Sequence, residues 1–445
     1  MRILLVNPPI YDFAAYDFWL KPYGMLKVAG YLRHAADLSL FDYLDREHPF
    51  SLAAHLRRDA WQRGAFLSEE VEKPAIFRSI PRRYHRFGLP RHLFRKYLQE
   101  HGPFDVVMIQ SVMTYWYPGI REVLEDVKAY CPEAKTVLGG VYATLCPKHA
   151  ESLGVDLLLQ GSQLGPLWQL LNVQPDLEGL PFWEGYPQLK VGILKLAQGC
   201  PFRCSYCSVP KVDPRFYGHP QEQSLRAAEM LINRGVTDIA FYDDALLYQP
   251  ERILVPFLTE FMRRHQGQPV HFHTPNALNA RFITEELAEL MIAAGFKTFH
   301  LGFESSAYEW HRHTDRKVYS HELERAVERL VTAGAKRDHI TAYLIMGHPQ
   351  AELQNVEASI RFVRDVGIRC MLAEFSPIPG TPDGEACRQW VDLDEPLWHN
   401  KTVFPILHLG WDEVQRLKRI AHEANRCVAD QMATERDCPM VATLS

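Results

Sequence analysis

The sequence predicts an α/β protein with two parallel-sheet domains in series. Two observations predict this fold class. Strand-like apolar runs alternate with helical patterns in both halves of the chain, and a proline-containing stretch at 172–190 separates the halves. The chain has 445 residues, which is enough for two or three domains with cores of their own. Its 47% apolar content, 23% charged content and net charge of −5 are typical of a soluble globular protein and make nucleic-acid binding unlikely as its main role.

The first half, residues 1–171, has the pattern of a doubly wound, Rossmann-like sheet. A helical pattern at 119–130 lies between two of its strand-like runs. In such sheets ligands bind beyond the carboxyl ends of the strands. No Gly-x-Gly-x-x-Gly fingerprint is present, which disfavours a dinucleotide. The strand-like runs are 3–6, 38–41, 106–109, 136–138 and 156–159.

An arginine-rich insertion at 45–102 interrupts this half, and Tyr84 and Phe87 are interleaved with its basic residues. A basic, aromatic segment can bind phosphate or single-stranded nucleic acid. More often such a segment is a solvated face or a collar packed between domains, and we favour that interpretation. The arginines include Arg57, Arg58, Arg82, Arg83, Arg86 and Arg91.

The second half, residues 191–384, contains six strand–helix units after the linker at 172–190. Six such units predict a partial (β/α)6, TIM-like barrel, whose chemistry lies at the carboxyl ends of the strands. Residues 385–445 form a predicted helical extension, and its helical pattern at 411–430 is placed to close the open side of the barrel. The expected strands are 193–197, 238–242, 270–273, 298–303, 340–345 and 370–375, and the expected helices are 222–234, 251–265, 284–294, 320–333 and 353–366.

The expected location is the cytoplasm. The N-terminus lacks the pattern of a secretory signal peptide, and no apolar run is long enough to span a bilayer. The nine cysteines show no disulfide framework, as expected for a reducing compartment.

Three cysteines, Cys200, Cys204 and Cys207, form a Cys-x3-Cys-x2-Cys motif directly after the first strand of the second half. Three thiolates can hold a four-iron cubane and leave one iron open for a further ligand. A zinc site usually has four ligands in paired knuckles, and no second knuckle is evident; a chance match is the other alternative. Cys427 and Cys438 are too loosely spaced for a second cluster and are interpreted as ordinary reduced cysteines.

This motif, at the carboxyl end of the first strand of a predicted barrel, resembles that of the radical S-adenosylmethionine (radical SAM) enzymes, over about residues 190–385. The resemblance implies that Cys200, Cys204 and Cys207 bind a [4Fe-4S] cluster and are the catalytic and metal-binding residues. In that family the open iron chelates the amino and carboxylate groups of S-adenosylmethionine (SAM). Reductive cleavage of SAM then yields a 5′-deoxyadenosyl radical.

The first half resembles the cobalamin-binding domain that precedes the radical module in one large subgroup of this superfamily. The matching runs are 2–9, 22–32, 111–117, 139–144 and 158–161. The resemblance implies that the loops after the strands and a glycine pair approach the cobalamin, because any Cβ would collide there. The Asp-x-His-x-x-Gly motif that supplies an axial histidine is absent, as is common among radical members; the alternative is a domain that has lost its cofactor. The candidate cobalamin-binding residues are Asn7, Pro8, Ser111, Thr114, Gly139, Gly140 and Tyr142.

The resemblance also suggests a SAM pocket at the strand ends of the second half. Asp243 and Asp244 replace the usual Gly-Gly-Glu-like run; one would hold the SAM amino group and the other would cap the next helix. Glu304 occupies an acidic position near the ribose or substrate, and Arg316 would pair with the methionine carboxylate. The remaining candidates are Tyr206, placed to pack on adenine, and Asn276, Gly347 and Pro379, which follow strand ends at the barrel rim.

Three histidines also lie on the strands of the second half. His271 and His273 are expected on the same face of one strand, because strand side chains alternate. His271 and His300 are interpreted as barrel histidines with satisfied hydrogen bonds rather than as functional groups.

Together the two resemblances imply a cobalamin-dependent radical SAM enzyme that methylates an unactivated carbon. In such an enzyme methylcobalamin donates the methyl group and a second SAM remethylates the cobalt. The alternatives are a radical cyclase or rearrangement enzyme that transfers no methyl group, and a noncatalytic iron–sulfur or cobalamin sensor. Methylthiolation is disfavoured, because the first half lacks a second cysteine triplet. The expected partners are a small-molecule or peptide substrate and an electron donor such as flavodoxin or ferredoxin.

Overall fold

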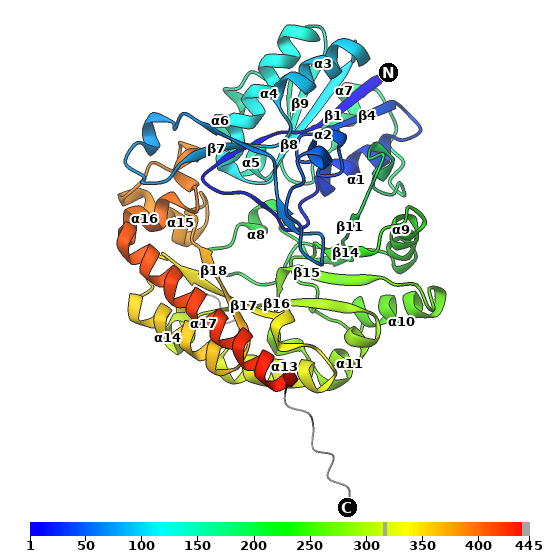
Figure 1. Ribbon diagram of the computed structural model, residues 1–445. Helices are drawn as coiled ribbons and strands as arrows, with labels where there is room; N and C mark the ends of the chain where they lie inside the picture. Colours follow the sequence, from blue (N-terminus) through cyan, green and yellow to red (C-terminus); the bar gives the residue numbers. More distant parts are fainter. Residues whose placement is uncertain (315–317, 438–445) are drawn as a thin grey trace, which may run out of the picture. The chain divides into compact units, whose positions relative to one another are not determined.

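The computed structural model describes residues 1–314 and 318–437, and it contains two large sheets flanked by helices (Figure 1). This confirms the predicted α/β class with parallel-sheet domains. The described residues divide into two compact units. Unit 1 contains residues 1–201, 206–240 and 376–403, and unit 2 contains residues 202–205, 241–314, 318–375 and 404–437.

Unit 1 contains a five-stranded parallel sheet in the order β10-β9-β8-β1-β4. β1 lies between the second and the third strand of the sheet along the chain, so the strand order reverses between β1 and β8. Ligands of open parallel sheets bind at such a reversal. The strands are β1 (Arg2–Asn7), β4 (Asp37–Asp42), β8 (Val106–Ser111), β9 (Lys135–Gly140) and β10 (Leu157–Leu158).

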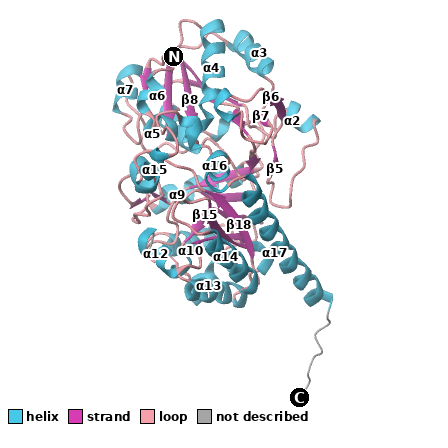
Figure 2. Cartoon of the chain, turned by 90° about the vertical axis from the view of Figure 1, so that its left-hand side faces the viewer, coloured by secondary structure: helices cyan, strands magenta, loops and turns pink. Residues whose placement is uncertain are grey.

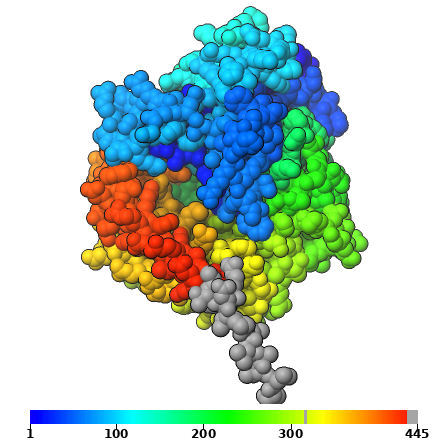
Figure 3. Space-filling model, viewed as in Figure 1, coloured from blue at the N-terminus to red at the C-terminus, as the bar shows by residue number. Residues whose placement is uncertain are grey.

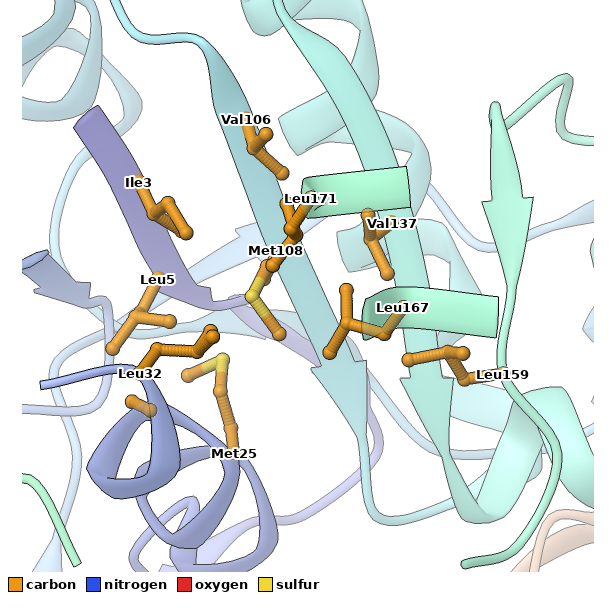
Figure 4. Close-up of a cluster of buried hydrophobic side chains, with 11 residues drawn as sticks. Ile3, Leu5, Met25, Leu32, Val106, Met108, Val137, Leu159, Leu167 and Leu171 are labelled. Carbon is orange, nitrogen blue, oxygen red and sulfur yellow. The ribbon is translucent and has the colours of Figure 1, made fainter. Parts of the chain in front are cut away.

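Apolar helix faces cover this sheet. Helices α1 (Tyr23–Leu32) and α7 (Gly165–Leu171) pack on one face, where their side chains meet those of β1, β8 and β9 (Figure 4). The strands are buried on both faces and therefore lack the alternation of a half-exposed strand. Further helices are α3 (Arg91–His101), α4 (Tyr117–Tyr130), α5 (Val141–Leu145) and α6 (Pro147–Glu151). The buried core residues are Ile3, Leu5, Met25, Ala29, Leu32, Val106, Met108, Val137, Leu159, Leu167 and Leu171.

The arginine-rich insertion forms part of the surface, in the blue shades of Figure 3, but the two aromatic residues interleaved with its arginines do not. Tyr84 and Phe87 are buried, and the Arg86 guanidinium forms a buried pair with Glu122, Nη2 to Oε1 at 2.6 Å. Since base stacking requires accessible rings, this supports the packing interpretation over nucleic-acid binding. It contains α2 (Pro49–Ala53), β5 (Gly64–Ala65), β6 (Ser68–Val71) and β7 (Tyr84–Phe87). β6 and β7 form an antiparallel sheet with β2 (Ile10–Asp12), and β5 pairs with β3 (Tyr16–Asp17), both from the N-terminal part of the chain.

Two segments distant in sequence complete unit 1. In the predicted linker at 172–190, Tyr186 is buried and its hydroxyl donates to the Asp42 carboxylate. In the segment 376–403, the Asn400 side-chain amide donates to Asp12 Oδ1 at 2.9 Å, and Asp12 is fully buried. Helix α15 (Pro382–Ala386) and the 3-10 helix η7 (Pro396–His399) lie in this segment.

The second large sheet has six strands in their order along the chain, β11-β14-β15-β16-β17-β18. In unit 2, α14 (Leu353–Asp365) and α17 (Trp411–Asp437) pack against β18 (Figure 2). The strands are β11 (Val191–Leu194), β14 (Asp238–Phe241), β15 (His271–Leu278), β16 (Phe296–Glu304), β17 (Ile340–Met346) and β18 (Arg369–Glu374). The other helices are α9 (Gln221–Asn233), α10 (Leu254–Arg264), α11 (Glu285–Ala293), α12 (Tyr308–Thr314), α13 (Ser320–Thr332) and α16 (Val403–Leu409).

No helix in the described part of the chain is both long enough and apolar enough to cross a membrane.

Candidate functional site

The three motif cysteines lie on one short loop, residues 199–208, between β12 (Ala197–Gln198) and α8 (Val209–Val212). Cys204 is 9% exposed, and Cys200 and Cys207 are half-buried. β12 pairs with β13 (Tyr217–Gly218), which fixes the start of the loop, and α8 follows its end. Three thiols are thus held on one constrained turn.

Gly199 explains how the chain enters this loop. It has φ +74°, and a Cβ there would lie 2.3 Å from the Arg215 carbonyl oxygen. Only glycine fits such a backbone in such a space, so the glycine before the first cysteine has a structural reason.

The middle of the loop is held by residues of unit 2. The Phe202 ring lies 6.0 Å from the Tyr248 ring and 6.2 Å from the Phe282 ring, centroid to centroid. The Ser205 backbone N–H donates to the Thr314 carbonyl at 2.9 Å. The residues between the cysteines therefore act as anchors of the loop.

Three thiols on one loop are the donor set that a cubane with one open iron requires. A zinc ion requires ligands that converge on one atom. In a cubane each thiolate binds a different iron, so the three sulfurs need not converge.

The two aspartates predicted to meet SAM follow β14. Asp243 is buried and Asp244 is half-buried. The Asn276 side-chain amide donates to the carbonyls of Tyr242 and Asp243, at 3.0 and 3.3 Å, so Asn276 fixes the turn that carries both carboxylates. The prediction that one of them caps the next helix is wrong. The next helix, α10, has Ile253 as its N-cap, because an intervening turn separates it from the strand.

Glu304, the last residue of β16, has the most unusual backbone among the predicted residues. It is 8% exposed and has φ +66°, a left-handed conformation that costs a non-glycine residue about 1–3 kcal/mol. The register between β16 and β17 shifts between Gly302 and Glu304. Strain of this kind at a buried carboxylate supports a functional role for Glu304.

The other predicted pocket residues lie on turns or outside the described chain. Gly347 has φ +82°, and a Cβ there would lie 2.6 Å from the Pro405 Cβ, so packing within unit 2 already requires glycine. Pro379 is half-buried in unit 1, and Tyr206 is half-buried in the cysteine loop. Arg316 lies outside the described residues.

The barrel histidines differ in their surroundings. His300 Nδ1 lies 2.9 Å from the Thr274 carbonyl and its ring stacks on Tyr343, which confirms it as a satisfied buried histidine. His273 is fully buried, with Nδ1 3.0 Å from the Thr298 hydroxyl, whereas His271 is half-buried.

In unit 1 a cleft opens where the strand order reverses between β1 and β8. Its empty volume, open solvent included, is about 310 Å³, so a corrinoid bound here would extend well beyond it. The predicted residues Asn7, Pro8 and Ser111 line it. Gln110, at a predicted strand end, and Trp116, in the run 111–117, also line it. Lys21 lines it as well and was not among the predicted residues, because its approach depends on the tertiary fold.

Several predicted cobalamin residues have partners within the protein. The Asn7 amide donates to Asp42 at 2.7 Å, and the Ser111 hydroxyl donates to the Met113 carbonyl at 2.9 Å. In addition, the Thr114 hydroxyl lies 2.9 Å from His399 Nδ1, and the Tyr142 hydroxyl lies 2.6 Å from His149 Nδ1. These side chains shape the edge of the sheet, so a cofactor would be met mainly by backbone.

Of the two glycines predicted to approach cobalamin, only Gly139 is left unexplained by packing within the protein. Gly140 has φ +91°, and a Cβ there would lie 2.8 Å from the Ser111 carbonyl oxygen, so the fold itself requires glycine. At Gly139 a Cβ would meet nothing closer than the Leu159 Cβ at 3.7 Å. Close approach of a ligand would explain glycine at 139, so the residues present are compatible with cobalamin.

Comparison with known proteins finds a family domain in the second half of the chain. Residues 194–363 match the model of the Radical SAM superfamily. An uncharacterized methyltransferase of Pyrococcus horikoshii is 24% identical over 254 residues, which are 55% of this chain and 51% of that protein. The ribosomal protein uS12 methylthiotransferase RimO of Chlorobium phaeobacteroides is 36% identical over 75 residues, 17% of each chain. The chain therefore aligns with about half or less of the length of these curated relatives.

Two solved structures share the fold over most of the chain. The radical SAM methyltransferase TsrM from Kitasatospora setae, with tryptophan substrate and a SAM analog bound, superposes with a TM-score of 0.64 at 16% identity, covering 87% of this chain and 76% of its own. The cobalamin-dependent radical enzyme OxsB, with aqua-cobalamin and SAM bound, gives 0.55 at 11% identity, covering 95% and 61%. At these identities the likeness establishes a common fold.

Proposed function

We propose that this chain, which carries a radical SAM domain at residues 194–363, is a cobalamin-dependent radical SAM enzyme that methylates an unactivated carbon. A radical SAM domain implies a [4Fe-4S] cluster and SAM. The observation that carries the rest is the fold likeness to TsrM, which spans 87% of the chain and so includes the sheet of unit 1 as well as the radical domain. TsrM is a methyltransferase that has been solved with cobalamin and a [4Fe-4S] cluster bound.

The proposal assigns a role to each part of the chain. Residues 1–171 are the cobalamin-binding domain, 172–190 the linker, 191–384 the radical SAM domain and 385–445 a helical extension. The order of the six strands β11 to β18, which follows the chain, supports a partial barrel for the radical domain.

The chain's own residues would hold and orient the reactants. Cys200, Cys204 and Cys207 hold the cluster, and the turn fixed by Asn276 presents Asp243 and Asp244 to the SAM ammonium. When bound, the cluster would supply the electron for SAM cleavage, taken from a donor such as flavodoxin or ferredoxin, and cobalamin would supply methyl-carrying capacity. Burial of the carboxylates strengthens their attraction for the ammonium, because the local dielectric constant is low.

The test begins with SAM cleavage by anaerobically reconstituted protein. The wild type is expected to bind iron and sulfide and, with a reductant, to release 5′-deoxyadenosine. Cys204→Ala should lose the cluster and reduce this release at least about 100-fold, since no other cysteine can replace the ligand. Cys427→Ala is the matched control and should behave as wild type, because Cys427 is exposed on α17 and distant in sequence from the loop. Zinc in place of iron in the wild type would refute the proposal.

Methyl transfer is tested separately with SAM that carries a labelled methyl group. The proposal expects the purified protein to show corrinoid absorbance, the label to appear in the product, and unlabelled S-adenosylhomocysteine to form. Deoxyadenosine without transfer of label to any candidate substrate would favour cyclisation or rearrangement. Intact SAM under reducing conditions would favour a sensor.

A further inference from the structure

The function proposed above assigns no role to Gln110, which lines the cleft of unit 1. Gln110 is the last but one residue of β8, and side chains alternate along a strand, so it points to the same face of the sheet as Val106 and Met108. These two side chains pack with Met25 of α1 in the core of unit 1 (Figure 4). Gln110 therefore lies at the end of a buried row, where the apolar core meets the cleft.

One hydrogen bond fixes the orientation of the Gln110 side chain. Its Oε1 accepts from the Met25 backbone N–H, in the first turn of α1, at 3.2 Å. A backbone N–H can only donate, so the amide oxygen must face α1 and the NH2 group points away from it. Within the part of the chain that the structure describes, no group accepts a hydrogen bond from this NH2.

Other side-chain donors of the cleft are used within the protein. The amide of Asn7, the hydroxyl of Ser111 and the indole N–H of Trp116 each donate to another residue. The Gln110 NH2 differs from these three groups, because it remains available to a ligand of the cleft. A few polar groups placed in this way usually fix the orientation of a bound ligand.

The residue that pairs with Gln110 on the neighbouring strand β9 is Gly139. Packing within the protein gives no reason for glycine at this position, because its φ is not positive and a Cβ there would meet nothing closer than the Leu159 Cβ at 3.7 Å. Neighbouring strands lie about 4.8 Å apart, and paired residues point to the same face of the sheet. The space that a side chain would fill at 139 therefore lies beside the Gln110 amide.

We propose that a corrinoid in this cleft lies across Gly139 and accepts a hydrogen bond from the Gln110 amide. The proposal rests on the cobalamin binding proposed above, and it names the side chain that orients the cofactor. The acceptor is an oxygen atom. A corrinoid offers such atoms in the amide carbonyls of its ring side chains and in the phosphate of its nucleotide tail, and both accept from an amide N–H.

Gln110→Glu separates the contact with the ligand from the contact with α1. The new carboxylate still accepts from the Met25 N–H, where the first turn of a helix favours negative charge, but it has no N–H to donate. The thermal midpoint of unfolding should therefore stay at the wild-type value. The dissociation constant for hydroxocobalamin should rise about 10- to 100-fold, because the acceptor then faces a carboxylate. Equilibrium dialysis of the full-length chain, reconstituted with its cluster, measures this constant. Gln169→Glu, at an exposed position on α7, is the matched control and should bind as the wild type does.

Gly139→Ala tests the space beside the amide. A methyl group fits the folded chain at this position but fills the place assigned to the corrinoid. The variant should keep the wild-type stability and bind hydroxocobalamin at least about 10-fold more weakly. Gly165→Ala is the matched control, because a Cβ there also meets nothing within 4 Å and Gly165 lies at the start of α7.

Cobinamide, which lacks the nucleotide tail, distinguishes the two acceptors. If Gln110→Glu weakens the binding of cobinamide as much as that of hydroxocobalamin, the acceptor is a carbonyl of the ring side chains. If it weakens only the binding of hydroxocobalamin, the acceptor is the phosphate of the tail. The proposal is overturned, and cobalamin binding still stands, if the wild type binds hydroxocobalamin and either Gln110→Glu or Gly139→Ala binds it equally tightly. A wild-type chain that binds no corrinoid overturns both proposals.

Discussion

At the scale of single residues, Glu304 combines a buried carboxylate with a left-handed backbone. Replacement by glycine removes the backbone strain and the carboxylate together. Glu304→Gly should therefore raise the free energy of unfolding by about 1 kcal/mol while lowering deoxyadenosine release at least about 10-fold. Urea denaturation and the SAM cleavage assay measure the two effects.

A matched control is available for this prediction. Asn172 at the end of α7 has φ +51° and is exposed, so Asn172→Gly relieves the same kind of strain without removing a buried charge. The Asn172→Gly protein should gain a similar free energy of unfolding and release deoxyadenosine at the wild-type rate. A Glu304→Gly protein that cleaves SAM at the wild-type rate would show that this carboxylate has only a structural role.

At the scale of elements, the β12–β13 hairpin positions the cysteine loop through Gly199. Gly199→Ala places a methyl group 2.3 Å from the Arg215 carbonyl oxygen and forces the loop to move. The iron and sulfide content after reconstitution should fall several-fold, as measured by chemical analysis. Gly154→Ala is the matched control, because Gly154 has φ +73° but a Cβ there meets nothing within 4 Å. If Gly199→Ala binds as much iron as Gly154→Ala, the close contact with the Arg215 carbonyl does not determine cluster binding.

Local sequence patterns predicted most regular elements to within a few residues. The expected strand at 298–303 is β16 (Phe296–Glu304), and the expected helix at 320–333 is α13 (Ser320–Thr332). The patterns could not find the antiparallel sheet β2-β7-β6, where Ile10 pairs with Phe87, because short strands carry weak periodicity and their pairing is not local. For the same reason the buried partners of Asn7 and Thr114, which are Asp42 and His399, were missed.

At the scale of the whole molecule, buried histidines couple stability to pH. His399 is fully buried; its Nε2 donates to the Leu393 carbonyl at 3.0 Å and its Nδ1 lies 2.9 Å from the Thr114 hydroxyl. Burial lowers its pKa from 6.5 to about 4. The folded state therefore binds fewer protons than the unfolded state. The stability from this group is fully present above pH 6.5 and is lost as the pH falls toward 4, by about 3 kcal/mol in total.

His399→Gln should remove that part of the pH dependence. The free energy of unfolding, measured by urea titration at several values between pH 4 and pH 7, should decrease less steeply toward acid than in the wild type. His34→Gln, at an exposed position, should keep the wild-type slope. Equal slopes for all three proteins would mean that His399 does not contribute.

The contact between Asp12 and Asn400 also affects how the protein is made. These residues are 388 positions apart, and Asp12 has no exposed surface once unit 1 is folded. At translation rates of about 5–20 residues per second, the ribosome synthesises nearly the whole chain before Asn400 emerges. The N-terminal sheet of the nascent chain therefore keeps an incomplete core until residue 400 is available. We expect chaperone dependence to be greatest late in synthesis, just before residue 400 leaves the exit tunnel.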